Sequence, residues 1–381
     1  MISLIKRVLK CLGVKRVNAL AARLRGIVYP IGDFLGYAVF FAFLKEAKEP
    51  APDRIKKVLI IRLDRIGDLV LSTPAIRAVR TGFPQAEIHL LVSEYTKDLV
   101  DNSPNINKLL IDGRDGLGGD YDLAFALHPG FKQNYLTFKS GAKMRAGYSG
   151  RGGSFFLTHK IEDDRATRIR HEVESALEIV GLLGCGTENR DLEITITEGG
   201  ERLADEFLKK NGLSDKDLII GIHPGSRQHY IRWKKERFAG VADKLTGTYN
   251  AKILLFGGGS EDSLVKSVVQ LMKKKPVVAF DLPLLQLVSL IKRCRLFISN
   301  STGPMHIAAA LKVPVTAIFG NMHPLDSYQE WGPWGEGHMI VSKDLKCPDC
   351  HPTDCRTFDC MTLITEEDVL NAVAGQLLRL K

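Results

Sequence analysis

The sequence predicts an α/β protein with two Rossmann-like domains that face a central cleft, preceded by an N-terminal amphipathic helical extension. Two series of short apolar runs, each of strand length and separated by helical stretches, predict this fold class. The runs lie at 58–63, 88–92, 109–111 and 123–127, and again at 218–222, 252–256, 277–280, 296–299 and 315–319. Strands that alternate with helices form parallel sheets, whose carboxyl-end loops would face the cleft.

The length and composition are sufficient for two ordinary domains. The chain has 381 residues, of which 45% are hydrophobic and 25% charged, and it contains no fixed-period repeat, which excludes a solenoid. Helices are expected over 72–80 and 171–183. The predicted parts are an extension over 1–50, a first domain over 55–195, a second over 200–345, and a cysteine-containing segment with a C-terminal helix over 346–381.

Most of the net charge of +9 lies in the first fifty residues. Ile2, Ile5, Leu9 and Leu12 recur at helical spacing, and the basic side chains lie largely outside this stripe. A helix with one apolar and one cationic face suits an anionic membrane surface, although packing on the protein's own body is the alternative. Because the rest of the chain is nearly balanced in charge, we do not expect nucleic acid as a partner.

The apolar stretch over 27–44 is interrupted by Pro30, Gly32 and Asp33 and is too short to cross a hydrocarbon core of ~30 Å. We expect it to dip into a membrane without spanning it. A signal peptide is not predicted, because no small-residue cleavage site follows the apolar run. These features predict a cytoplasmic protein that lies peripherally on the inner face of the cell membrane.

The first predicted strand leads directly into the sequence DRIGD, which ends at Asp68. Gly67 would allow a tight turn there, and Asp68 would be presented at the mouth of the cleft. A carboxylate near a helix amino end stays ionised at neutral pH, which suits a general base that takes a proton from a hydroxyl. The alternative is that Asp68 merely caps the helix, since aspartate is a favoured cap residue.

Two further strand ends in the second half have the composition of a diphosphate site. The first reads HPGSR and is followed by the cation Arg232, and the second is a glycine turn followed by an acid. A solvated basic loop is the alternative. The turn is not a dinucleotide fingerprint, because its sixth position holds Asp262. The candidate binding residues are His223, Gly225, Ser226, Arg227, Gly257, Gly258 and Glu261.

A third turn follows the strand over 296–299 and opens a helix. Ser301, Thr302 and Gly303 offer hydroxyls and backbone amides of the kind that bind phosphate, and His306 lies one turn into the helix. A single histidine in such a place is more often structural. Three turns of this composition in one domain predict a nucleotide site.

Together, four stretches of the sequence resemble the heptosyltransferase family of lipopolysaccharide assembly. These enzymes are inverting glycosyltransferases with two Rossmann-like domains, the GT-B fold, and they use ADP-heptose. The resemblance covers about 57–380 and rests on the stretches Val58–Arg80, Gly221–Leu245, Phe256–Asp262 and Phe297–Gly320.

The resemblance implies a role for each matching residue. Asp68 would activate the acceptor, and Thr302 with Gly303 would hold the donor diphosphate, whose departure Arg232 would assist. Family members usually have a Lys and often an Arg just before the tryptophan, and here Arg232 occupies one of those places and Ile231 the other. They also have an acidic residue where this chain has Ser301. The first domain would bind a lipid-linked saccharide acceptor and the second the nucleotide sugar. No cofactor would be required, because side chains and helix amino ends can supply the positive charge.

Three other classes compete with this interpretation. A sugar-nucleotide epimerase of the same fold would need acid and base groups on both faces of the sugar ring. A glycan-binding homologue that has lost catalysis would fit the replacement at Ser301, but Asp68 argues against it. A Rossmann dehydrogenase is disfavoured, because the first strand ends in DRIGD and lacks the G-x-G-x-x-G turn.

Four cysteines precede the last predicted helix. Cys347, Cys350, Cys355 and Cys360 are spaced C-x2-C-x4-C-x4-C. In a reducing compartment such a cluster is more typical of a metal site than of disulfides, and four thiolates satisfy tetrahedral zinc. The zinc would be structural, because four thiolates leave no open position. The later gaps differ from a second C-x-x-C pair, so free thiols are the alternative.

Overall fold

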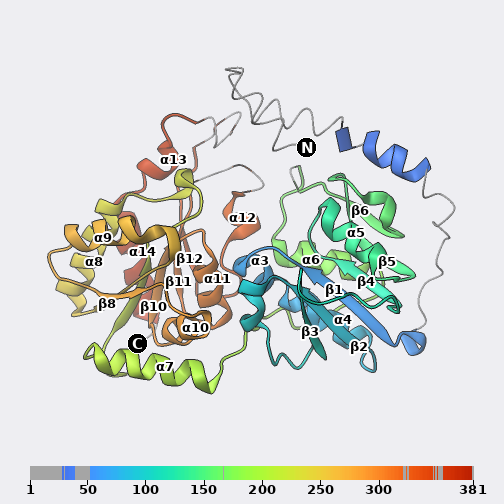
Figure 1. Ribbon diagram of the computed structural model, residues 1–381. Helices are drawn as coiled ribbons and strands as arrows, with labels where there is room; N and C mark the ends of the chain where they lie inside the picture. Colours follow the sequence, from blue (N-terminus) through green and yellow to red (C-terminus); the bar gives the residue numbers. More distant parts are fainter. Residues whose placement is uncertain are drawn as a thin grey trace.

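The computed structural model describes residues 28–29, 31–38, 52–165, 167–320, 323, 326–345, 347, 350 and 355–379. It contains two six-stranded sheets that lie side by side, each with helices around it (Figure 1). The predicted basic helix within residues 1–16 and most of the predicted linker over 45–54 lie outside the described residues.

The first sheet is entirely parallel, with strand order β3-β2-β1-β4-β5-β6. Its strands are β1 (Lys57–Arg62), β2 (Glu87–Val92), β3 (Lys108–Ile111), β4 (Leu123–Ala126), β5 (Met144–Ser149) and β6 (His159–Glu162). The chain connects them through helices α3 (Ile66–Leu71), α4 (Thr73–Gly82) and α5 (Phe131–Lys139), and α6 (Glu172–Gly181) follows β6. The strands β1 and β4 are almost wholly buried, as expected for the centre of a covered parallel sheet.

The second sheet repeats this topology, with strand order β12-β11-β10-β7-β8-β9. Its strands are β7 (Ile219–His223), β8 (Lys252–Gly257), β9 (Val277–Phe280), β10 (Leu296–Asn300), β11 (Val315–Ile318) and β12 (Met339–Val341). The helices are α7 (Glu198–Lys210), α8 (Lys235–Tyr249), α9 (Asp262–Leu271), α10 (Leu284–Lys292), α11 (Gly303–Ala310), α12 (Tyr328–Trp331), α13 (Asp359–Thr362) and α14 (Glu366–Arg379). Gln376 fastens α14 to this sheet, because its amide donates to the carbonyls of Val315 at 3.0 Å and Gly337 at 2.7 Å.

In both sheets the strand order reverses beside the first strand, so β1 lies next to β4 and β7 lies next to β10. At such a point the connections leave in opposite directions and open a crevice outside the carboxyl ends of the strands. The topology therefore predicts a ligand site at the ends of these four strands.

All nine strands that the sequence predicts are confirmed, each within one residue of its observed bounds. The strands β5, β6 and β12 were not predicted from the sequence. The strand β5 includes Gly147, a residue type that is depleted in strands, and the charged Arg145, which interrupts the apolar run. Arg145 is nevertheless buried, because its guanidinium donates to the carbonyls of Ala142 and Phe156. The strand β6 is a half-exposed edge, and β12 has only three residues.

Part of the predicted extension packs against the first domain as a helix over 31–38. The buried carboxylate of Asp33 accepts hydrogen bonds from the Gly153 amide at 2.8 Å and from the Ser154 hydroxyl at 2.6 Å. The opposite face exposes Ile31, Phe34 and Leu35, which are 55%, 73% and 59% exposed. Among the described helices, none combines the length and the apolar character that crossing a membrane requires.

We expect Asp33→Ala to release this helix from the first domain. The substitution leaves the Gly153 amide and the Ser154 hydroxyl without a partner, at about 1–3 kcal/mol for each buried group. Limited proteolysis would show faster cleavage within residues 28–54, and amide exchange at Gly153 would accelerate. Asp53→Ala, which changes an exposed aspartate, is the matched control. Equal cleavage of the two variants would show that Asp33 does not hold the helix.

Candidate functional site

A cleft of about 1090 Å³ lies between the two domains, at the carboxyl ends of β1, β7, β8 and β10. The structure brings together, along this cleft, the predicted catalytic and donor-binding residues Asp68, His223, Ser226, Arg227, Arg232, Gly257, Gly258, Glu261, Ser301, Thr302, Gly303 and His306. Gly225 is the predicted residue that does not line it. Its role is steric, because a Cβ at Gly225 would lie 1.8 Å from the Glu261 carboxylate.

Asp68 lies in the first turn of α3, where it both faces the cleft and caps the helix. Its Oδ2 atom accepts a hydrogen bond from the Arg65 backbone amide at 3.2 Å, and its Oδ1 atom lies 3.3 Å from Nη2 of Arg62. Burial raises the pKa of Asp68 above its usual value, Arg62 opposes this rise, and Glu172 adds to it. A carboxylate with a raised pKa is suited to general-base catalysis.

A second carboxylate, Asp64, lines the cleft at the end of the same strand. Burial raises its pKa to about 6, against the opposing effect of Arg62. Its Oδ1 atom lies 3.7 Å from Nε2 of His128, and burial together with Arg62 lowers the pKa of this histidine to about 2. His128 is therefore neutral at physiological pH. Asp64 remains the nearest competitor of Asp68 for the role of base.

The buried guanidinium of Arg62 organises these carboxylates, and the sequence analysis missed it. Nη2 of Arg62 lies 2.6 Å from Glu172 as well as 3.3 Å from Asp68. Glu172 is 110 residues distant in sequence, so no local motif contains both. The one available signal was a charge at the end of the otherwise apolar strand VLIIR, because a buried charge requires a partner.

Asp68, His128 and Glu172 also bring potential ligand atoms within 4.8 Å of one another, a spacing that a metal ion could use. The Arg62 guanidinium contacts both of these carboxylates and already supplies positive charge to them. We therefore interpret the group as a buried ion network.

On the second domain, Glu261 connects the first two predicted donor turns. Its Oε2 atom accepts from the Gly258 amide at 3.2 Å and lies 3.2 Å from Nε2 of His223. Burial would raise the pKa of Glu261, but the hydrogen bonds from His223 and Gly258 lower it below its usual value. Glu261 is thus an ionised acceptor at the cleft, suited to a hydroxyl-bearing ligand.

Asn300, at the end of β10, fixes the third turn relative to the first. Its side-chain amide donates to the carbonyls of Pro224 at 2.8 Å and Gly225 at 3.1 Å, and its oxygen accepts from the Trp233 amide at 3.0 Å. Thr302, which precedes α11, shares a hydrogen bond of 2.9 Å with Ser299. The amino end of α11 therefore lies beside the HPGSR turn.

Gly67 has a different role from the tight turn that the sequence suggested. A Cβ at Gly67 would lie 2.6 Å from the His306 ring, and one at Gly303 would lie 3.0 Å from Ile66. The two glycines therefore allow α3 and α11, one from each domain, to pack closely. Burial lowers the pKa of His306 to about 3, so its ring is neutral and carries no positive charge toward a phosphate.

Two arginines contribute positive charge to the side of the cleft that the second domain forms. Arg232 donates from its guanidinium to the Ser226 carbonyl at the HPGSR turn. Arg227 forms no ion pair with any residue in the described part of the chain, and burial together with the nearby Arg65 lowers its pKa. Ile231, one of the two positions where the resemblance would place a cation, also lines the cleft.

Buried polar atoms without a hydrogen-bond partner among the described residues gather at this cleft. They include Nδ1 of His223, Oγ of Ser226, Nε of Arg232 and Nδ1 of His306. Buried polar groups are normally paired, so each such atom calls for an explanation. A polar ligand on this side of the cleft would explain all four.

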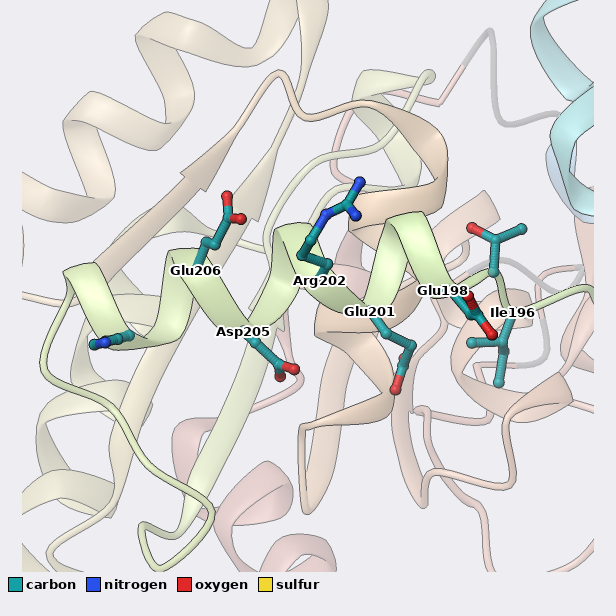
Figure 2. A pocket seen from close by; sticks show the side chains of 8 residues that line it. Ile196, Glu198, Glu201, Arg202, Asp205 and Glu206 are labelled. Carbon is teal, nitrogen blue, oxygen red and sulfur yellow. The ribbon is translucent and has the colours of Figure 1, made fainter.

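A second hollow lies along α7, away from the strand ends. Figure 2 shows that Glu201, Arg202 and Asp205 are spread along α7 and do not converge on one point. Glu201 and Asp205 are paired with Arg293 at 3.2 and 2.7 Å, as in a solvated charged surface. We therefore assign the functional site to the cleft.

None of the four cysteines, which all lie among the described residues, lines the cleft. Cys360 is the second residue of the short helix α13, which starts at Asp359. Burial raises the pKa of the Cys360 thiol to about 11, and Cys350, Cys355 and Cys347 contribute to this rise. The Phe358 amide donates to the sulfur of Cys355 at 3.4 Å. The other three sulfurs thus lie within electrostatic range of Cys360.

Comparisons with known proteins agree with this geometry. Lipooligosaccharide heptosyltransferase 2 of Campylobacter jejuni is 26% identical over 325 residues, which cover 80% of this chain and 93% of that protein. Lipopolysaccharide heptosyltransferase 3 of Escherichia coli K12 is 26% identical over 335 residues, 80% and 94% of the two chains.

Solved structures show the same fold. A family 9 glycosyltransferase from Veillonella parvula superposes with a TM-score of 0.76 at 28% identity, over 87% of this chain and 99% of that one. The E. coli ADP-heptose lps heptosyltransferase II gives a TM-score of 0.69 at 21% identity, over 85% and 99%. Residues 114–359 match the family described as glycosyltransferase family 9 (heptosyltransferase), and the chain is an enzyme of this family.

Proposed function

We propose that the protein transfers heptose from ADP-heptose to a hydroxyl of a lipid-linked saccharide of the lipopolysaccharide core, with inversion and with Asp68 as the general base. The observation that carries this proposal is the single cleft in which Asp68 faces the unpaired polar atoms of the second domain. The names of the relatives support heptose as the sugar and a lipopolysaccharide or lipooligosaccharide as the acceptor. The resemblance of the sequence motifs implies ADP as the carrier.

In this mechanism the first domain holds the acceptor and the second holds the donor. Asp68 takes the proton of the acceptor hydroxyl as the oxygen attacks the anomeric carbon, and the nucleoside diphosphate departs. Arg232 and Arg227 stabilise the charge on the departing diphosphate, and the amides at the start of α11 bind its oxygens. Glu261 accepts a hydrogen bond from a hydroxyl of the nucleotide or of the sugar. Arg227 supplies the positive charge that family members have at the position of Ile231.

We expect Asp68→Asn to abolish transfer while donor binding persists. Asparagine keeps the size of the side chain and can still cap α3, but it takes up no proton, and loss of a general base typically lowers the rate by about 10² to 10⁴. Calorimetry with ADP-heptose and ADP release with truncated lipopolysaccharide as acceptor are the measurements. Asp64→Asn, which changes the neighbouring carboxylate, is the matched control.

Arg232→Ala gives the contrasting result, weaker donor affinity together with slower turnover, because the diphosphate is charged in both the ground and the transition state. Near-normal turnover of a folded Asp68→Asn would contradict the assignment of the base. If Asp64→Asn alone abolished transfer, the role would pass to Asp64.

We also propose that the enzyme lies on an anionic membrane surface, where it meets its lipid-linked acceptor. The basic residues of the extension are complementary to anionic headgroups, and the exposed face of the helix over 31–38 offers apolar side chains to the acyl boundary. Because Asp33 holds this helix on the first domain, the contact would orient the acceptor domain toward the membrane.

We expect the full chain to sediment with phosphatidylserine-containing liposomes and not with pure phosphatidylcholine. Phe34→Asp combined with Leu35→Asp should weaken this binding, because charge would enter the apolar face. Leu378→Asp, which changes a side chain that is 69% exposed on α14, is the control and should bind normally. Unchanged sedimentation of the double variant, or equal binding to both kinds of liposome, would exclude this contact surface.

We propose that Cys347, Cys350, Cys355 and Cys360 hold a structural metal ion, with zinc as the fitting ion for four thiolates. The spacing of the four cysteines and the Phe358 amide that donates to the Cys355 sulfur support a thiolate site. The metal would stabilise the segment before α14 and would have no role in the transfer step.

We expect about one equivalent of zinc in protein purified without oxygen, and its loss on Cys350→Ser combined with Cys355→Ser. Elemental analysis measures the metal, and a melting curve measures the loss of stability that should follow. Cys185→Ser, which changes a buried cysteine outside the cluster, should retain the metal. Metal-free wild-type protein that melts at the same temperature as the double variant would refute the site.

A further inference from the structure

The strongest feature that the proposed mechanism does not use is the sharing of one nitrogen of Arg62 between two carboxylates. Nη2 lies 2.6 Å from Oε1 of Glu172 and 3.3 Å from Oδ1 of Asp68. The first is a short charge-assisted hydrogen bond, and the second is at the long limit of one. The guanidinium is therefore committed mainly to Glu172.

The unequal sharing of Arg62 between Glu172 and Asp68 affects how readily Asp68 can act as a general base. A carboxylate that is tightly paired with an arginine has its pKa lowered by about 1–3 units and becomes a weak base. Glu172 counteracts this in two ways. It takes the short bond of Arg62, and its own negative charge raises the pKa of Asp68.

Glu172 is held in place by rigid partners. It lies in the first turn of α6, where it is fully buried, and its Oε2 atom accepts from Nη1 of Arg165 at 3.0 Å. Arg165 is in turn fixed by Asp163 at 2.8 Å and lies 3.9 Å from Glu330 on α12 of the second domain. Nε2 of the preceding His171 donates to the Gly332 carbonyl, 3.0 Å away and also in the second domain.

We propose that Glu172 is a positioning residue that holds the Arg62 guanidinium away from Asp68 and so keeps Asp68 able to take the acceptor's proton. This inference rests on the proposed function, in which Asp68 is the base. The other charged or titratable groups that face this cluster include Asp64, His128, Arg65, Arg165, Glu330, His171, Arg227, Tyr95 and Tyr148. Because Glu330 and Gly332 belong to the second domain, the position of Glu172 also depends on the contact between the domains.

The test is the pH profile of turnover for Glu172→Gln in the full-length enzyme, with ADP release from ADP-heptose and truncated lipopolysaccharide as acceptor. Without the charge of Glu172, Asp68 and Asp64 are the carboxylates that remain near Arg62, at 3.3 and 3.6 Å, so Arg62 acts more strongly on Asp68 and the pKa of Asp68 falls. The acid limb of the profile should therefore move to lower pH by about one unit, and the plateau rate should fall. The KM for ADP-heptose should stay unchanged, because Glu172 does not line the cleft.

Two variants complete the design. Glu174→Gln changes an exposed residue on the same helix and should leave the profile at the wild-type position. Glu172→Asp keeps the charge but is one methylene shorter, so it should shift the acid limb in the same direction by a smaller amount. If melting curves show that Glu172→Gln does not fold, Glu172→Asp decides the question, and an unchanged acid limb in that variant overturns the proposal.

Asp68→Asn, measured in parallel, distinguishes a failure of Asp68 as the base from a failure of the positioning role of Glu172. If Asp68→Asn retains turnover, the proposed base is wrong. If Asp68→Asn is inactive but the acid limb of folded Glu172→Gln coincides with that of the wild type, the base stands and the positioning role of Glu172 is refuted.

Discussion

A guanidinium buried at the end of a central strand is the constraint on which the geometry of the cleft depends. Arg62 is wholly inaccessible, and an uncompensated charge in such a place would cost several kcal/mol. Its partners come from separate parts of the first domain, namely the Leu127 carbonyl after β4, Glu172 on α6, Asp68 on α3 and Asp64 in the turn after β1. Meeting this requirement draws together the elements around the point where the strand order of the first sheet reverses.

The second constraint is steric and joins the two domains. The helices α3 and α11 pack against each other only because Gly67 and Gly303 carry no side chain at the contact. This contact brings the turn that carries Asp68 beside the turn that carries Thr302. Gly67 and Gly303, one from each of two sequence motifs, thus explain why one cleft contains residues from both domains.

The sequence alone determined the fold class, the turns that line the cleft, and nine of the twelve strands found in the described residues. Each of these features is encoded locally. A buried parallel strand appears in the sequence as a continuous apolar run, and a turn that can bind phosphate appears as glycine and hydroxyl residues at the end of a strand. The strands β5, β6 and β12 could not be found in this way. A buried Arg145, an edge position and a length of three residues each remove the apolar signal on which the prediction depends.

Only the tertiary structure decided the contacts and the protonation states of the predicted residues. It showed that Asp68 caps α3 and faces the cleft at once, that His306 is neutral, and that Gly225 and Gly67 serve close packing. It also revealed Glu172 as the main partner of Arg62, 110 residues away in the sequence. The pKa of a group depends on its burial and on charges that come near it only in the folded chain, so the motif around Asp68 identifies a carboxylate but does not fix its basicity.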